Sequence, residues 1–131
     1  MILELYRQLK EIAERDFSEI VEDSEIIFSH TGRARKLRIR LIDTTYIDIW
    51  CSPEGEYSFH WEQTDVRNTI YRHDNAPHLR WSHVKTFPKH CHDGYQESII
   101  ESHLPDKPYE AIKGFLSIVR KRLVKLKQVK D

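Results

Sequence analysis

The sequence predicts an α+β fold in which a five-stranded antiparallel meander carries an N-terminal and a C-terminal helix packed on one face. Three observations lead to this prediction. Apolar residues recur at helical spacing near both ends, alternate with polar residues between positions 24 and 73, and lose any regular period between 74 and 104. We therefore expect a single domain over residues 1–131, with a histidine-rich loop between the last strand and the C-terminal helix.

The N-terminal helix is predicted over residues 2–21, where Ile2, Leu5, Leu9 and Ile12 share one face and charged residues lie between them. From residue 24 the period changes to two, which is typical of half-buried strands. The short turns between the apolar runs, such as 53–56, favour antiparallel neighbours. The five strands are expected at 24–28, 36–41, 46–51, 57–62 and 69–73.

The C-terminal helix is signalled by Pro105 to Pro108, which supply a cap and a first turn with preset geometry. An apolar stripe follows over residues 109–126. Residues 74–104 form a longer connection than a compact domain usually contains, so we expect them to be functional. The aromatic side chains of Trp81, Phe87 and Tyr95 indicate that this loop is ordered.

The composition excludes several classes of protein. Twenty-one basic residues balance 21 acidic ones, so no net charge indicates general binding of nucleic acid or lipid. The apolar runs are too short to span a bilayer, and the acidic, amphipathic start is unlike a secretory signal. The two cysteines, Cys51 and Cys91, lie far apart, and we expect reduced thiols in a cytoplasmic protein.

Histidines concentrate between positions 73 and 92, which hold five of the eight in the chain. Such a cluster suits proton transfer or metal ligation. His90 and His92 would project to the same side of an extended backbone, and Asp74 could orient an imidazole or complete a coordination shell. Asp74 is also typical of an ordinary Asx turn. Cys91 is a weaker candidate nucleophile, because no third member of such a unit is evident.

A second constellation follows from the alternation in residues 36–41. If Leu37, Ile39 and Leu41 face the core, then Lys36, Arg38 and Arg40 share the opposite face, together with His60 from a later strand. Guanidinium groups beside an imidazole could hold a phosphodiester. The alternative is a solvated face on which these cations pair with acids of the neighbouring strands.

Several segments of the chain carry a resemblance to a known family. Asp74 to His78, then Thr86 to Pro88 and His90 to Gly94, resemble the signature of the TumE-like toxin family of prokaryotic toxin–antitoxin systems, as does the aromatic strand before them. The resemblance covers residues 45–125, and Lys89 departs from it because the family commonly has histidine there. The matching positions are Tyr71, Arg72, Asp74, Asn75, Pro77, His78, Thr86, Phe87, Pro88, His90 and His92.

The resemblance implies a toxin with a cognate antitoxin, typically of helix-turn-helix type. Our mechanistic hypothesis is metal-independent cleavage of RNA, because RNA carries its own nucleophile, the 2′-hydroxyl group. The candidate acid–base residues are His78, His90 and His92, with Asp74 orienting an imidazole. The candidate substrate-binding residues are Arg38, Arg40, His60, Arg72 and Lys89.

Other functions stay open at this point. We expect no cofactor, and the alternative is a divalent metal such as zinc held by His78, His90 and His92. The alternative to an enzyme is a partner-binding protein or a metal-binding module without catalysis. RNA is the expected substrate, no membrane is involved, and the sequence is compatible with a homodimer.

Overall fold

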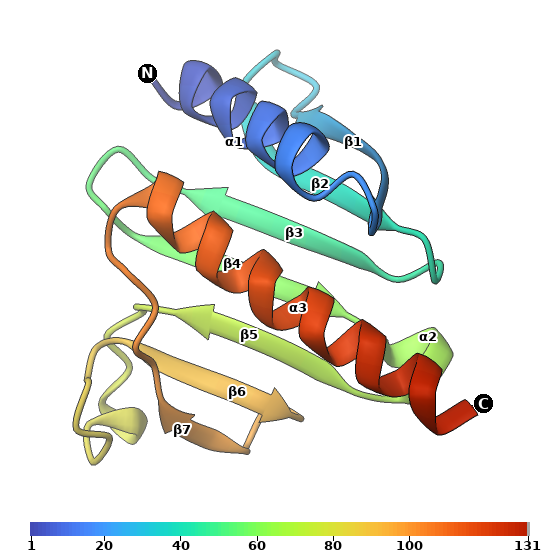
Figure 1. The fold of residues 1–131 in the computed structure, drawn as a ribbon. Coiled ribbons are helices and arrows are strands. Elements are labelled where there is room, and N and C mark those ends of the chain that lie inside the picture. The colour runs from blue at the N-terminus through green and yellow to red at the C-terminus, as the bar shows by residue number, and fades with distance from the viewer. Residues whose placement is uncertain (131) are drawn as a thin grey trace.

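The computed structural model describes the backbone of residues 1–130 and the side chains of residues 1–128. One layer is a sheet and the other consists of two helices (Figure 1). The helices are α1 (Ile2–Asp16), α2 (Thr64–Arg67) and α3 (Pro108–Lys130), with a 3₁₀ turn, η1, at Leu79–Trp81. The strands are β1 (Val21–Phe28), β2 (Ala34–Leu41), β3 (Tyr46–Cys51), β4 (Tyr57–Glu62), β5 (Ile70–Asp74), β6 (His90–Gly94) and β7 (Ile99–Glu101).

The sheet is an antiparallel meander in which the strands lie in sequence order from β1 to β7. The prediction of an α+β meander is confirmed, but the number of strands was wrong, since the sheet has seven rather than five. The expected loop over 74–104 contains the two additional strands, β6 and β7. They lack the alternating apolar pattern of a strand, and pairing holds them in the sheet, β6 against β5 and β7 against β6.

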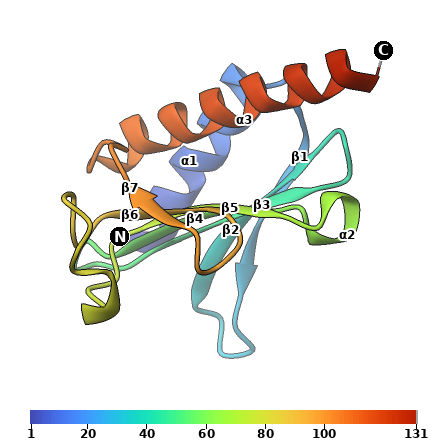
Figure 2. The same cartoon turned by 90° about the horizontal axis from the view of Figure 1, so that it is seen from below.

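Both long helices cover the same face of the sheet, as predicted (Figure 2). Helix α1 ends at Asp16 rather than near residue 21, and β1 begins only a few residues later at Val21. Pro108 opens α3, where its fixed backbone angle suits the first helical turn. No helix among the described residues is long and apolar enough to cross a membrane.

The hydrophobic core lies between the helices and the sheet. Side chains alternate along each strand, so that Leu37, Ile49 and Trp61 are fully buried beneath the helices. Phe115 of α3 packs against Phe59 and stacks on Tyr71. Within residues 1–130, neither long helix lies over the opposite face of the sheet, and the short turn η1 lies on that side (Figure 2). The alternation that builds the core therefore also presents polar side chains on an open face.

Candidate functional site

The open face of the sheet carries most of the candidate residues. Strand register aligns one residue from each of five strands in a row across this face: Arg38, Asp48, His60, Arg72 and His92. A second, shorter row contains Ser58, Asp74 and His90. The predicted grouping of the β2 cations and His60 on the face opposite the core is consistent with this register, since Leu37, Ile39 and Leu41 are buried.

The cations of β2 are paired with acids. The Arg38 guanidinium donates two hydrogen bonds to Asp48, at 2.8 and 2.9 Å, and the Lys36 ammonium donates a third to the same carboxylate. Burial works to raise the pKa of Asp48, but the hydrogen bonds from Arg38 and Lys36 hold it below its ordinary value. Arg40 pairs with Asp23 and Glu25 of β1. The structure thus shows the ion pairs that were the alternative to a phosphate site on this strand.

His60 lies in the row between Asp48, which pairs with the β2 cations, and Arg72, which borders the histidine cluster. Its Nε2 lies 3.1 Å from Glu62, and its Nδ1 lies 3.4 Å from an Arg72 guanidinium nitrogen. Burial lowers the pKa of His60, and the nearby charge of Arg72 acts in the same direction. A neutral His60 therefore positions Arg72, whose other nitrogens donate to Asp74 and Gln96.

Asp74, His90 and His92 form a compact group that we call the floor triad. Asp74 ends β5 and pairs with His90 in the register of β6, while His92 lies two residues further along that strand. Nε2 of His90 is 3.1 Å from Oδ1 of Asp74, and Nε2 of His92 is 3.6 Å from Oδ2. Both imidazoles are 1% exposed. The prediction that His90 and His92 project to the same side is confirmed.

Backbone carbonyls orient both rings of the floor triad. Nδ1 of His90 lies 2.8 Å from the carbonyl oxygen of Pro88, and Nδ1 of His92 lies 2.6 Å from that of Gln96. A carbonyl oxygen only accepts hydrogen bonds, so Nδ1 of each ring carries the proton that it donates. Each Nε2 then faces the Asp74 carboxylate.

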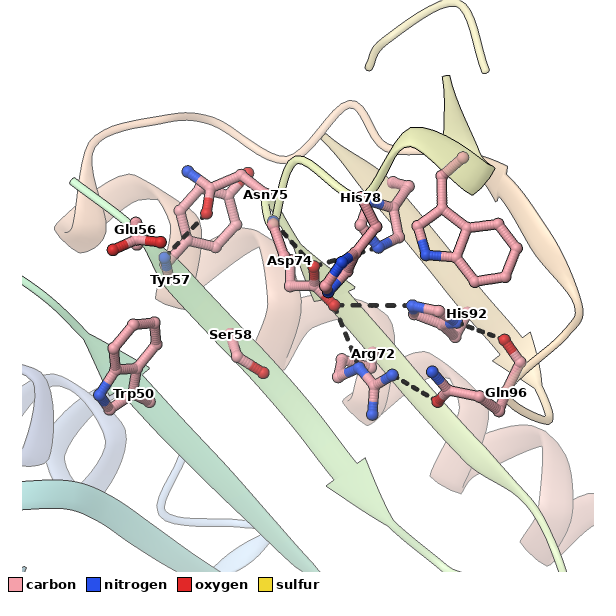
Figure 3. A pocket seen from close by; sticks show the side chains of 13 residues that line it. Trp50, Glu56, Tyr57, Ser58, Arg72, Asp74, Asn75, His78, His92 and Gln96 are labelled. Atoms are coloured by element: carbon pink, nitrogen blue, oxygen red, sulfur yellow. Dashed lines mark hydrogen bonds and ion pairs between the residues drawn. The ribbon is translucent and has the colours of Figure 1, made fainter. Parts of the chain in front are cut away.

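The floor triad lies at the base of a cleft of about 280 Å³ (Figure 3). Arg72 and Gln96 border the triad, while the indole of Trp81 packs against both imidazoles. Trp50 and His78 line the same cleft and are exposed. The cleft therefore combines ionisable groups at its base with aromatic surface and a free imidazole at its mouth.

Asn75 closes one end of this cleft through two hydrogen bonds from a single amide. Its Oδ1 accepts the Tyr57 backbone N–H at 2.9 Å, and its Nδ2 donates to the Gly55 carbonyl at 3.0 Å. The preceding Asp74 accepts the Ala76 N–H at 3.0 Å, which is the Asx turn expected from the sequence. The Asp74–Asn75 pair thus attaches the chain leaving β5 to the β3–β4 hairpin.

Three other candidates lie outside the cleft. The Lys89 ammonium contacts the Leu104 carbonyl and the Asp106 carboxylate, away from the floor triad. His73 points toward the helices, where its two nitrogens contact Ser102 and Tyr71, and burial lowers its pKa to about 4. Cys91 is 1% exposed, and burial raises the pKa of its thiol to about 12, so it is not an activated nucleophile.

Several residues of the cleft were absent from the sequence-based set, and Gln96 and Trp81 are the two that contact the imidazoles of the floor triad. Gln96 fixes His92 with its backbone and Arg72 with its side chain, but it follows a strand that the sequence pattern did not reveal. Trp81 was recognised only as a sign of order in the loop. A tryptophan between two histidine-bearing segments is the signal that could have suggested an aromatic wall for the site.

The fold and the cleft define a small α+β protein with a histidine-, arginine- and carboxylate-lined site on an open sheet face. The chain belongs to the TumE toxin family, because the family model described as Toxin TumE matches residues 9–123. Membership implies that this protein is the toxin component of a toxin–antitoxin system and has an antitoxin partner. No curated protein and no solved structure matches the chain significantly.

Proposed function

We propose that this toxin acts in the cytoplasm by cleaving RNA in the cleft above the floor triad. The observation that carries the proposal is the convergence of Arg72, His78 and the floor triad in one accessible cleft. These are the side-chain types that transesterification of RNA requires: groups that move protons and a cation that binds the phosphate. The exposed indole of Trp50 offers a surface on which a base can stack.

The reaction that fits these groups begins with the 2′-hydroxyl of the substrate. Its oxygen forms a bond to phosphorus while a base accepts its proton, and the bond from phosphorus to the 5′-oxygen breaks as an acid protonates that oxygen. The products are a 2′,3′-cyclic phosphate and a 5′-hydroxyl group. Positioned proton transfer contributes typically about 10²- to 10⁴-fold to such a rate.

His78 is the residue we assign to one of the two proton transfers. It is exposed at the mouth of the cleft and so meets substrate directly. Arg72 is the proposed phosphate ligand, held in place by Asp74 and Gln96. His90 and His92 stay candidates for the second proton transfer. Their Nε2 atoms face Asp74, so a proton moved by either ring would be shared with the Asp74 carboxylate.

The test is cleavage of a labelled single-stranded RNA by the purified protein, without its antitoxin, in EDTA and in a divalent ion. His78→Gln and Arg72→Gln should each reduce the cleavage rate by at least about 100-fold. His103→Gln is the matched control, because His103 is exposed and lies outside the cleft. It should retain the wild-type rate.

A toxin that kills cells but cleaves RNA in neither condition would refute the proposal and favour a partner-binding protein. A cleavage rate unchanged in both cleft variants would also refute it, because the activity would then lie elsewhere. We further propose that the antitoxin is of helix-turn-helix type, and a neighbouring gene product of another class would contradict this.

A further inference from the structure

We propose that Asp74, His90 and His92 bind one divalent transition-metal ion, such as Zn²⁺. The inference goes beyond RNA cleavage, since it concerns a binding site and holds whether or not the chain cleaves RNA. One carboxylate oxygen and two imidazole nitrogens are a common donor set for catalytic zinc. Asp74 takes the place that the sequence analysis gave to His78, which lies at the mouth of the cleft.

The spacing of the three donor atoms matches what a metal requires. Zinc binds nitrogen and carboxylate oxygen at about 2.0–2.2 Å, so neighbouring ligands in a tetrahedron lie roughly 3.3–3.6 Å apart. Here Nε2 of His90 lies 3.1 Å from Oδ1 of Asp74, and Nε2 of His92 lies 3.6 Å from Oδ2 of the same carboxylate. One donor atom from each residue lies within 4.8 Å of the other two, so an ion between them can contact all three once the side chains adjust to shorten the widest separation.

The hydrogen bonds that orient the three donor side chains are of the kind found around metal ligands. Histidines that bind a metal usually donate their other N–H to a carbonyl or carboxylate, which fixes the ring and its tautomer. His90 and His92 both do this, with Pro88 and Gln96 as the acceptors. The Asp74 carboxylate is fixed as well, because the Ala76 N–H and the Arg72 guanidinium each donate to one of its oxygens.

The charge in the cleft also favours a cation. Two imidazole nitrogens face the Asp74 carboxylate, and an ion bound there displaces any proton that lies between them. The cleft contains two carboxylates, Asp74 and Glu56, and one guanidinium, Arg72. One divalent ion would contact all three donors and add positive charge to the cleft, which favours binding of a phosphodiester.

The position of the triad points to a site with an open coordination position. Structural zinc sites are closed by four protein ligands, whereas catalytic sites keep a position for water or substrate. Among the side chains that the structure describes, three donors converge here, and they line the cleft. When bound, the ion would supply Lewis-acid polarisation of a phosphoryl oxygen beside Arg72.

Metal binding by the purified, untagged chain tests the inference without any RNA. After EDTA treatment and dialysis, the protein is titrated with Zn²⁺ by calorimetry and with Co²⁺ by visible absorption. The wild-type protein and His103→Gln should bind one ion per chain. Asp74→Asn and His92→Gln should each weaken binding by at least about 100-fold while keeping the wild-type circular dichroism spectrum.

Failure of wild-type protein to bind zinc at micromolar concentration would overturn the inference, as would equal affinity in His92→Gln and the control. If Asp74→Asn does not fold, His92→Gln decides the question, and His90→Gln serves as the second ligand variant. Failures of the two proposals are distinguishable. Cleavage of RNA by a protein that binds no ion would refute only the proposed metal site. Zinc binding without cleavage would refute only the proposed nuclease activity.

Discussion

Asn75→Ala should destabilise the fold, because the side chain of this motif residue holds the β3–β4 hairpin. The substitution removes two hydrogen bonds, one from the Tyr57 N–H at 2.9 Å and one to the Gly55 carbonyl at 3.0 Å. A hydrogen bond contributes a net of about 0.5–1.5 kcal/mol, and an unsatisfied buried group costs about 1–3 kcal/mol. Because Tyr57 is buried and Gly55 is exposed, we expect a loss of about 2 kcal/mol in the free energy of unfolding.

Urea unfolding followed by circular dichroism measures this loss, with Glu54→Ala as the control in the same hairpin. Glu54 is exposed, so its replacement should change the free energy of unfolding by less than about 0.5 kcal/mol. Asn75→Asp keeps an acceptor for Tyr57 but places a carboxylate against the Gly55 carbonyl, so it should not restore full stability. If Asn75→Ala is as stable as the control, the amide does not hold the cleft together, and its place in the motif needs another explanation.

Three further predictions concern the interior and the open face. Tyr6→Phe should lower the free energy of unfolding in urea by about 2 kcal/mol, because the buried hydroxyl accepts the Cys51 N–H and donates to the Arg35 carbonyl. A loss under about 0.5 kcal/mol would contradict this. Asp48 has a pKa below its ordinary value of 3.8, so its contribution to stability is present above that pH and is lost as the pH falls through the lowered pKa. The midpoint temperature of thermal unfolding should therefore be higher for wild type than for Asp48→Asn at pH 6, and the difference should shrink in acid. A difference that stays the same in acid would refute the assignment. Both cysteine thiols are buried and have pKa values raised to about 11 and about 12, so a thiol reagent should label them only after unfolding, and rapid labelling of the native chain would contradict the structure.

The sequence was informative wherever an apolar pattern set the structure. Alternation in β2, β3 and β4 identified both the strands and the face that their polar residues occupy, because the core selects one side of each strand. Strand β6 was missed, since His90 to Gly94 contains one apolar residue, Cys91, and its outward residues belong to the site. A segment whose side chains serve a site lacks the pattern that identifies a strand.

The residues of the site were predicted better than their arrangement. His90 and His92 lie on one side of an extended chain in any strand, so their proximity followed from spacing alone. Their position against Asp74 depends on the register between β5 and β6, which are separated by a long connection. Local pattern does not determine that register. The pairing of Arg38 with Asp48 was open for the same reason, since it depends on how β2 aligns with β3.

The proposed cleavage of RNA in the cleft proceeds through the 2′-hydroxyl group. The most direct measurement compares a labelled RNA with the same strand carrying 2′-deoxyribose throughout, incubated with wild-type protein and His78→Gln. We expect that only the RNA is cut, with 2′,3′-cyclic phosphate ends, and that His78→Gln loses this activity. Equal cutting of the deoxy strand, or undiminished cutting by the variant, would contradict it.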